Sequence, residues 1–157
     1  MTDSLDRADR RILEILQTEG RISNQTLAER VNLSPSPCLR RVRALEEAGY
    51  ITGYRATVDA QRLGYGLNVV LHISMDQHTP ERFDAFETRV AALPEVVECL
   101  LITGQEADYQ LRIWVVDMED YQRLLLHHIT RIPGVSGVHT SFVLRRVLTA
   151  RALPART

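Results

Sequence analysis

Three arginines, Arg40, Arg41 and Arg43, are the residues of this chain best suited to bind an anion, because they lie within four positions. The guanidinium group donates hydrogen bonds in a planar fork that fits both a phosphate and the edge of a guanine. Ser36 lies about one helical turn before Arg40 and adds a hydroxyl group to the same stretch. This combination indicates contact with DNA, provided that the surrounding elements present the side chains on one exposed face.

The sequence around these arginines predicts a helix with one apolar side, from which the arginines point away. We expect its inward stripe to be formed by Cys38, Leu39, Val42 and Leu45. Ser34-Pro35 and Ser36-Pro37 each resemble a capping residue followed by the first residue of a helix. Because a proline disfavours helical geometry in the residue before it, the helix begins at Ser34 or at Ser36. Gly49 is expected to end it.

Two more short helices are predicted before this one. Apolar residues at helical spacing predict the first helix between Asp6, which can cap its start, and Gly20, which ends it. Ser23 caps the second helix, and Asn32-Leu33 forms the turn that leads to the third. Short capped helices joined by a tight turn are typical of a helix-turn-helix, in which one helix braces another in the major groove. We therefore predict a DNA-binding domain over residues 1–52.

A short strand or wing is predicted after this domain, because apolar and polar residues alternate over residues 51–58. Arg55 lies in this segment, within reach of a phosphate. Residues 59–66 contain two glycines, and we assign residues 53–67 to a strand and hinge linker. The predicted DNA-binding residues are Ser34, Ser36, Arg40, Arg41, Arg43 and Arg55.

Residues 68–157 show a different pattern, in the order strand, helix, strand, strand, helix, strand. Alternation predicts strands near residues 67–76, 96–103, 109–116 and 138–148, and apolar stripes predict helices near residues 83–93 and 118–132. Leu93-Pro94-Glu95-Val96 and Ile132-Pro133-Gly134-Val135 follow the two helices as a weak internal repeat. Two such β-α-β halves form a ferredoxin-like fold, so the chain is predicted to be α+β with two domains.

The predicted strands carry large apolar residues on both faces, although two helices can cover only one face of a four-stranded sheet. Leu111 and Ile113 oppose Trp114, and Phe142 opposes Val143. A sheet with one wet face should alternate more cleanly. We therefore predict that the second face packs against another subunit, sheet to sheet, in a homodimer. Paired recognition helices would then read a DNA site with two-fold symmetry.

The net charge of −1 excludes a protein that binds nucleic acid through bulk positive charge, so any contact must come from local clusters. The two cysteines, Cys38 and Cys99, indicate reduced structural thiols rather than a metal cluster or a disulfide framework. We expect neither a secretory signal nor a membrane-spanning run, which points to a cytoplasmic protein without a membrane partner.

An ordered set of motifs carries a resemblance to a known family. The motifs are Leu5-Asp6-Arg7-x-Asp9-x-x-Ile12-Leu13, Leu27-Ala28-x-x-Val31-x-Leu33-Ser34, Arg40-Arg41-Val42-x-x-Leu45-Glu46-x-x-Gly49-x-Ile51, Pro94-x-Val96 and Pro133-Gly134-Val135. Together they resemble the Lrp/AsnC (leucine-responsive/asparagine-regulator, feast/famine) family of prokaryotic transcription regulators over nearly the whole chain. The resemblance implies a winged helix-turn-helix, a hinge, and a ligand-sensing domain that dimerises through its sheet. It also implies further assembly into tetramers or octamers, and a response to amino acids.

The resemblance places an effector loop between the second and third strands of the sensing domain. The family usually has Gly-x-x-Asp-Tyr there, whereas this chain has Thr103-Gly104-Gln105-Glu106-Ala107-Asp108-Tyr109, with one extra residue. Backbone N–H groups around Gly104 suit a carboxylate, and Asp108 with Glu106 suits an ammonium group. Thr130 is expected to complete the pocket from a neighbouring dimer. The expected effector-binding residues are Thr103, Gly104, Gln105, Glu106, Asp108 and Thr130, and no other cofactor is expected.

Three other kinds of protein stay open as alternatives. An enzyme on the ferredoxin-like fold is not favoured, because the sequence has no nucleophile–base pair or metal motif, and His127-His128 diverge on a helix. A metal-responsive regulator would show zinc-dependent DNA affinity. A nucleoid-organising protein would share the DNA-binding domain and the dimer but would not respond to amino acids. The leading hypothesis is a sequence-specific DNA-binding regulator controlled by a small molecule, with operator, effector and sign of regulation left open.

Overall fold

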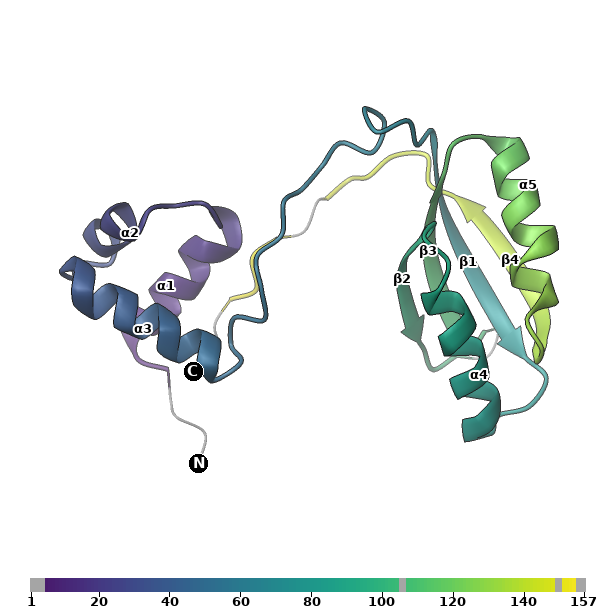
Figure 1. Cartoon of the computed structure of the whole chain (residues 1–157), viewed down its shortest axis with the longest axis horizontal. Coiled ribbons are helices and arrows are strands. Elements are labelled where there is room, and N and C mark those ends of the chain that lie inside the picture. The colour runs from purple at the N-terminus through teal and green to yellow at the C-terminus, as the bar shows by residue number, and fades with distance from the viewer. Residues whose placement is uncertain (1–4, 105–106, 149–150, 155–157) are drawn as a thin grey trace. The chain divides into compact units, whose positions relative to one another are not determined.

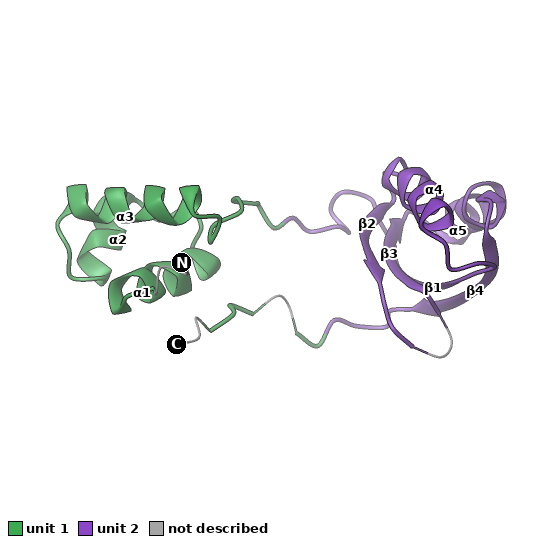
Figure 2. Cartoon of the chain, turned by 90° about the horizontal axis from the view of Figure 1, so that it is seen from below, with its two compact units in different colours: residues 1–57, 147–157 green, residues 58–146 purple. Residues whose placement is uncertain are grey.

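The computed structural model describes residues 5–104, 107–148 and 151–154. The chain forms two compact units, a helical unit of residues 1–57 and 147–157 and a sheet unit of residues 58–146 (Figure 2). Residues 147–148 and 151–154 of the C-terminal tail are thus grouped with the helical unit. The Gln17 side chain holds this tail, because it donates to the Leu153 carbonyl at 3.0 Å and accepts from the Leu153 N–H at 2.7 Å.

Three helices make up the helical unit: α1 (Arg7–Thr18), α2 (Asn24–Arg30) and α3 (Pro35–Glu47) (Figure 1). The predicted caps are confirmed. Asp6 accepts a hydrogen bond from the Asp9 N–H while the Asp9 side chain accepts from the Asp6 N–H, and this capping box satisfies two donors at the start of α1. Ser23 accepts from the Thr26 N–H at the start of α2. The core of the unit is formed by Ile12, Ile15, Leu27, Ala28, Cys38 and Leu45.

Helix α3 begins at Pro35 with Ser34 as its N-cap, so the first of the two predicted starts is the correct one. Proline fits in the first turn of a helix, where the N–H groups have no intrahelical acceptor to lose. The helix ends as predicted at Gly49, which adopts a φ of 77°. The N–H groups of Gly49 and Tyr50 donate to the carbonyls of Glu46 and Leu45, which closes the last turn.

Residues 51–66 form no strand, which corrects the prediction of a strand or wing over residues 51–58. A strand needs a hydrogen-bonded neighbour, and no segment of the described chain forms a ladder with residues 51–58. The segment is instead anchored by Tyr54, whose hydroxyl donates to the Glu46 carboxylate at 3.0 Å.

The sheet unit has the predicted order of strands and helices. Its strands are β1 (Leu67–Met75), β2 (Val96–Leu101), β3 (Tyr109–Val115) and β4 (Val135–Phe142). They form an antiparallel sheet in the order β2-β3-β1-β4. Helices α4 (Pro80–Ala91) and α5 (Met118–His127) lie on the same side of this sheet (Figure 2), and a short 3-10 helix, η1 (Ile129–Arg131), follows α5. The predicted ferredoxin-like fold is confirmed.

The core of the sheet unit lies between the two helices and one face of the sheet. Side chains alternate between buried and less buried along β1 and β3, as expected for strands that cover a core with one face. The fully buried side chains include Val69, Leu71, Ile73, Phe86, Tyr109, Leu111 and Ile113. The other face of the sheet is left open in the single chain.

The bounds predicted for the last strand are wrong, because β4 covers Val135–Phe142 rather than residues 138–148. Gly134, with a φ of 96°, turns the chain so that Val135 pairs with Met75. The ladder ends where Phe142 pairs with Val69, and Leu144 beyond it is 97% exposed.

None of the helices within the described ranges combines the length and the apolar character needed to cross a membrane.

Candidate functional site

The outward face of α3 carries side chains that were expected to meet DNA. Ser36, Arg40 and Arg43 are all exposed, while Cys38 on the opposite side is buried in the core. Leu39 was expected in the inward stripe, but it is 40% exposed. Because it lies three residues after Ser36, the helical repeat brings it toward the arginine face. An apolar side chain at that position suits contact with a thymine methyl group.

Arg41 does not join this face, which corrects the prediction that all three arginines point outward. Its Nη1 donates to Asp6 at 2.6 Å and to Asp9 at 2.8 Å. The bonds to Asp9 and Asp6 raise the pKa of the Arg41 guanidinium, and a hydrogen bond from the Asp9 N–H lowers the pKa of the Asp6 carboxyl. Arg41 therefore ties α3 to the start of α1. For Arg40 and Arg43, no ion pair is found within the described chain.

The turn between α2 and α3 fixes how α3 is presented. Asn32 adopts a left-handed φ of 55°, a conformation that asparagine tolerates better than most residues. Asn24, which sequence reasoning missed, donates from its side-chain amide to the Pro35 carbonyl at 2.9 Å and holds the first turn of α3. The Ser34 side chain makes no capping hydrogen bond, so its hydroxyl is open to a phosphate. In the first turn of α3 only the Ser36 N–H could join it, because Pro35 and Pro37 have no N–H and Cys38 donates to the Ser34 carbonyl. Arg55 is exposed in the extended segment that follows α3.

The predicted effector loop connects β2 to β3. Thr103 and Gly104 are exposed at its start, and the predicted residues Gln105 and Glu106 lie outside the described residues. One carboxylate oxygen of Asp108 accepts from the Met75 N–H at 2.6 Å, and the other lies 2.7 Å from Nε2 of His78. The Asp108 carboxylate is therefore held against the end of β1. His78 is a neighbour that sequence reasoning missed, because it lies 30 positions away in the chain.

Thr130 lies in η1, where its exposed hydroxyl donates to the Leu126 carbonyl at 3.3 Å. Within the part of the chain that the structure describes, no hydrogen bond joins Thr130 to the Asp108 loop. The role predicted for Thr130 requires a neighbouring dimer, which a single chain does not contain.

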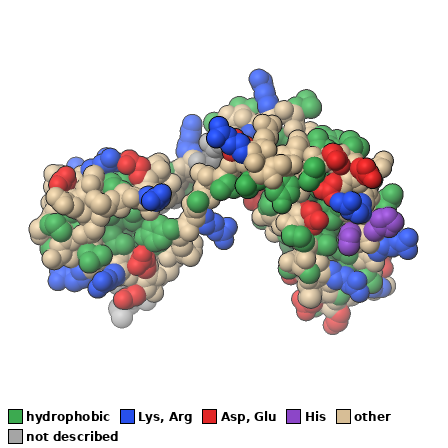
Figure 3. Space-filling view, turned by 45° about the horizontal axis from the view of Figure 1, so that its top comes forward, with side chains coloured by type: hydrophobic (Ala, Val, Ile, Leu, Met, Phe, Trp, Pro, Cys, Tyr) green, Lys and Arg blue, Asp and Glu red, His purple; other side chains and the backbone are tan. Residues whose placement is uncertain are grey.

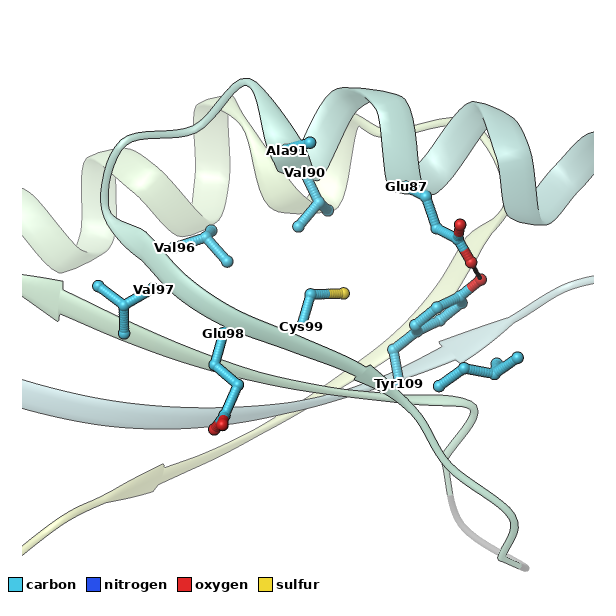
Figure 4. Close-up of a pocket in the computed structure, with 9 residues that line it drawn as sticks. Glu87, Val90, Ala91, Val96, Val97, Glu98, Cys99 and Tyr109 are labelled. Atoms are coloured by element: carbon cyan, nitrogen blue, oxygen red, sulfur yellow. Dashed lines mark hydrogen bonds between the residues drawn. The ribbon is translucent and has the colours of Figure 1, made fainter. Parts of the chain in front are cut away.

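A hollow of about 400 Å³ lies between α4 and the edge strand β2 (Figure 4). Glu87 and Tyr109 close one end, where the Tyr109 hydroxyl donates to the Glu87 carboxylate at 2.7 Å. The Cys99 side chain lies between the helix and the sheet (Figure 4). Burial raises the pKa of the Cys99 thiol and of the Tyr109 phenol, and the nearby Glu87 carboxylate raises both further. A raised pKa keeps the Cys99 thiol, which is exposed, in its less reactive protonated form near neutral pH.

The two units together define a DNA-binding transcriptional regulator that carries its own ligand-binding domain. Residues 5–52 match the family model described as winged helix-turn-helix DNA-binding, and residues 68–153 match the model described as Lrp/AsnC ligand binding domain. Since these matches cover most of the chain, it belongs to the Lrp/AsnC family.

Relatives of similar length support this assignment. The chain is 43% identical to the Bkd operon transcriptional regulator of Pseudomonas aeruginosa over 150 residues, which is 96% of this chain and 97% of the relative. It is 43% identical to the leucine-responsive regulatory protein of Escherichia coli over 153 residues, 98% of this chain and 93% of the relative. A transcriptional regulator from Neisseria meningitidis, solved with L-Met, superposes with a TM-score of 0.91 at 36% identity, covering 96% and 97% of the two chains.

Proposed function

We propose that this regulator changes its DNA binding when a free amino acid binds at the loop between β2 and β3. The observation that carries the proposal is the fixed position of the Asp108 carboxylate, 2.6 Å from the Met75 N and 2.7 Å from His78 Nε2. A carboxylate held in place can accept hydrogen bonds from an α-ammonium group without a large loss of freedom on binding. N–H groups near the exposed Gly104 are suited to the α-carboxylate of the same ligand.

Two relatives support an amino acid as the ligand class. The Escherichia coli relative is named a leucine-responsive regulatory protein, and the Neisseria meningitidis relative was solved with L-Met. The loop of this chain has one residue more between Gly104 and Asp108 than the family pattern, so neither leucine nor methionine is carried over. Thr103 and Thr130 complete the proposed site, with Gln105 and Glu106 in the loop itself.

Asp108→Asn tests this site by titration calorimetry over the twenty amino acids. We expect the wild-type protein to bind at least one, and the variant to lose about 1.5–3 kcal/mol, since it removes a hydrogen bond to a charged group. DNA binding without amino acid should stay the same in both proteins. Asp84→Asn, an exposed carboxylate on α4, is the matched control and should change nothing. Equal affinity of Asp108→Asn and wild type would remove Asp108 from the site. A wild-type protein that binds none of the twenty would favour the effector-blind, nucleoid-organising alternative.

We also propose which residues meet DNA. Ser36, Arg40 and Arg43 share the exposed face of α3 and are suited to base edges. Ser34, at the start of the helix, and Arg55, after it, are suited to phosphates and would position the protein without selecting a sequence. Arg41 is left out of this set because Asp6 and Asp9 already hold it.

A homodimer through the open face of the sheet is the third part of the proposal. The paired strands put Val70, Trp114 and Leu100 on that face, which supports burial against a second copy. The same face also carries Arg112, which pairs with Glu98 at 3.2 Å, so the interface is more polar than the alternation predicted. Further assembly into tetramers or octamers, and a place in the cytoplasm with the DNA that it binds, belong to the same proposal.

No observation favours the metal-responsive alternative. Within the described ranges, no three His, Cys, Asp or Glu side chains come together in a group that could hold a metal ion.

A further inference from the structure

We propose that a second group of arginines, between α1 and the α2–α3 turn, binds a phosphate of the DNA backbone. A groove of about 630 Å³ lies there, and its lining includes Arg7, Arg10, Arg11, Arg30, Val31 and Asn32. The groove is separate from the outward face of α3, which carries Arg40 and Arg43. Figure 3 shows that arginine side chains on the visible face of the helical unit gather in separate groups rather than in one basic surface.

Four arginines line the groove, and two of them, Arg7 and Arg10, have no carboxylate partner within the described chain. Arg11 pairs with Glu14 at 3.1 Å, and Arg30 pairs with Glu19. For Arg7 and Arg10, no ion pair is found in the part of the chain that the structure describes. The groove therefore has two paired arginines in its walls and two with guanidinium groups available to an anion.

Arg10 is partly buried where it lines this groove. Its Nε is shielded from solvent and has no acceptor within the described chain, so that atom is not the donor that an anion in the groove would reach. A guanidinium group also has two terminal nitrogens, whose N–H groups can donate two parallel hydrogen bonds to a phosphate.

The place of the groove in the fold identifies DNA as the source of the phosphate. Val31 and Asn32 form part of its wall and lead within a few residues to Pro35, where α3 begins. The groove thus opens near the N-terminal end of α3. Such helix ends, together with arginines, contact the DNA backbone and fix the position of a protein on the duplex. Arg7 and Arg10 would strengthen binding in this way without reading sequence.

The double variant Arg7→Gln/Arg10→Gln tests the proposal with two duplexes, a fragment that the protein selects from its native genome and one of mixed sequence. We expect the affinity for both to fall by a similar factor, about eightfold for each lost contact at about 0.1 M salt, because about 0.9 counterion is released per phosphate contact. The slope of log affinity against log salt should become shallower by about 0.9 per contact. Arg89→Gln, an exposed arginine on α4, is the matched control and should leave affinity and slope unchanged. A variant with the wild-type slope, or one that loses affinity for the selected fragment alone, would overturn the proposal.

Duplexes with uncharged phosphates distinguish a direct contact of Arg7 and Arg10 with DNA from an effect of the two substitutions on folding. Replacing single phosphates by methylphosphonates should reveal a position where the wild-type protein loses affinity and the double variant loses no more. Equal losses in both proteins at every position would overturn the proposal, whatever the stability of the variant.

Inorganic phosphate tests whether the groove binds free phosphate rather than a phosphate of DNA. If phosphate binds the wild type but not the variant and leaves the DNA affinity of the wild type unchanged at equal ionic strength, the groove binds free phosphate and the assignment to DNA is wrong.

Discussion

Single side chains on α3 divide between contact with DNA and support of the fold. Arg40 and Arg43 are exposed, whereas the neighbouring Arg41 donates to Asp6 and Asp9 on the first turn of α1. One position along a helix turns a side chain by about 100°, because there are 3.6 residues per turn. Adjacent arginines can therefore have unrelated roles, and substitution should separate them.

Arg40→Ala and Arg43→Ala should each weaken binding to a selected DNA fragment by about 1–3 kcal/mol if the side chain reads a guanine through two hydrogen bonds. Neither should change the free energy of unfolding, because both side chains are exposed. Arg41→Ala should instead lower the free energy of unfolding by about 0.5–1 kcal/mol, a value reduced for solvent screening since Arg41 is 35% exposed. Fluorescence anisotropy and denaturant unfolding measure the two effects.

Arg89→Ala on α4 serves as the control for loss of a positive charge far from the helix-turn-helix sequence. The division of roles would be contradicted by an Arg41→Ala variant that unfolds like the wild type and loses DNA affinity as Arg40→Ala does. It would also be contradicted if Arg40→Ala and Arg43→Ala changed only the stability.

Residue types and spacing predicted which side chains carry the chemistry. They did not predict which residues these side chains contact. The arginines of α3 were visible as a group, yet nothing in the sequence shows that Asp6, 35 positions away, holds Arg41. Asp108 was likewise predicted from its motif, whereas its contact with His78 depends on how β1 and β3 are brought together. Long-range ion pairs follow from packing, and packing is not encoded in local spacing.

At the scale of elements, the start of α1 combines a capping box with the brace to α3. Asp6 accepts from the Asp9 N–H, which lowers its pKa, and it also accepts from Arg41. A carboxyl with a pKa below its usual 3.8 stabilises the fold fully above that value, and the stabilisation is lost as the pH falls through the lowered pKa. The helix-turn-helix should thus lose part of its stability only in strong acid.

Asp6→Asn tests this pH dependence. We expect the variant to be less stable than the wild type near neutral pH. The difference should shrink as the pH falls below 3.8 and through the lowered pKa of Asp6, where the wild-type carboxyl becomes neutral. Thermal unfolding followed by circular dichroism across this range measures both proteins. Asp84→Asn on α4 is the control. A stability difference that stays constant to the lowest pH would show that the Asp6 charge does not act as described.

Elements with local signals were predicted well, and elements that need a distant partner were not. The caps at Asp6 and Ser23 and the end of α3 at Gly49 depend on neighbouring residues, and all three are confirmed. Residues 51–58 alternate like a strand but have no pairing partner within the described chain, so no strand forms there. The bounds of β4 depend on its pairing with β1, which the alternation of residues 138–148 could not reveal.

At the scale of the whole molecule, we expect DNA binding to depend on pairing two helical units through their sheet units. Val70→Arg should disrupt this pairing, because it puts a second positive charge in the centre of the open sheet face, beside Arg112 of β3. Sedimentation at micromolar concentration should show a dimer or larger assembly for the wild type and a smaller species for the variant. Leu126→Arg, on the exposed side of α5, is the control and should sediment like the wild type. A monomeric wild-type protein would contradict the proposed dimer.

The central claim is that a small molecule bound by the sheet unit changes how the helical unit binds DNA. Its most direct test is the affinity for a fragment selected from the native genome, measured with and without each of the twenty amino acids at constant salt. We predict that at least one amino acid shifts the dissociation constant by about fivefold or more, the lower end of typical coupling between sites. The shift should disappear in Asp108→Asn and persist in Asp84→Asn. Twenty binding curves that superpose on the curve without amino acid would contradict the claim.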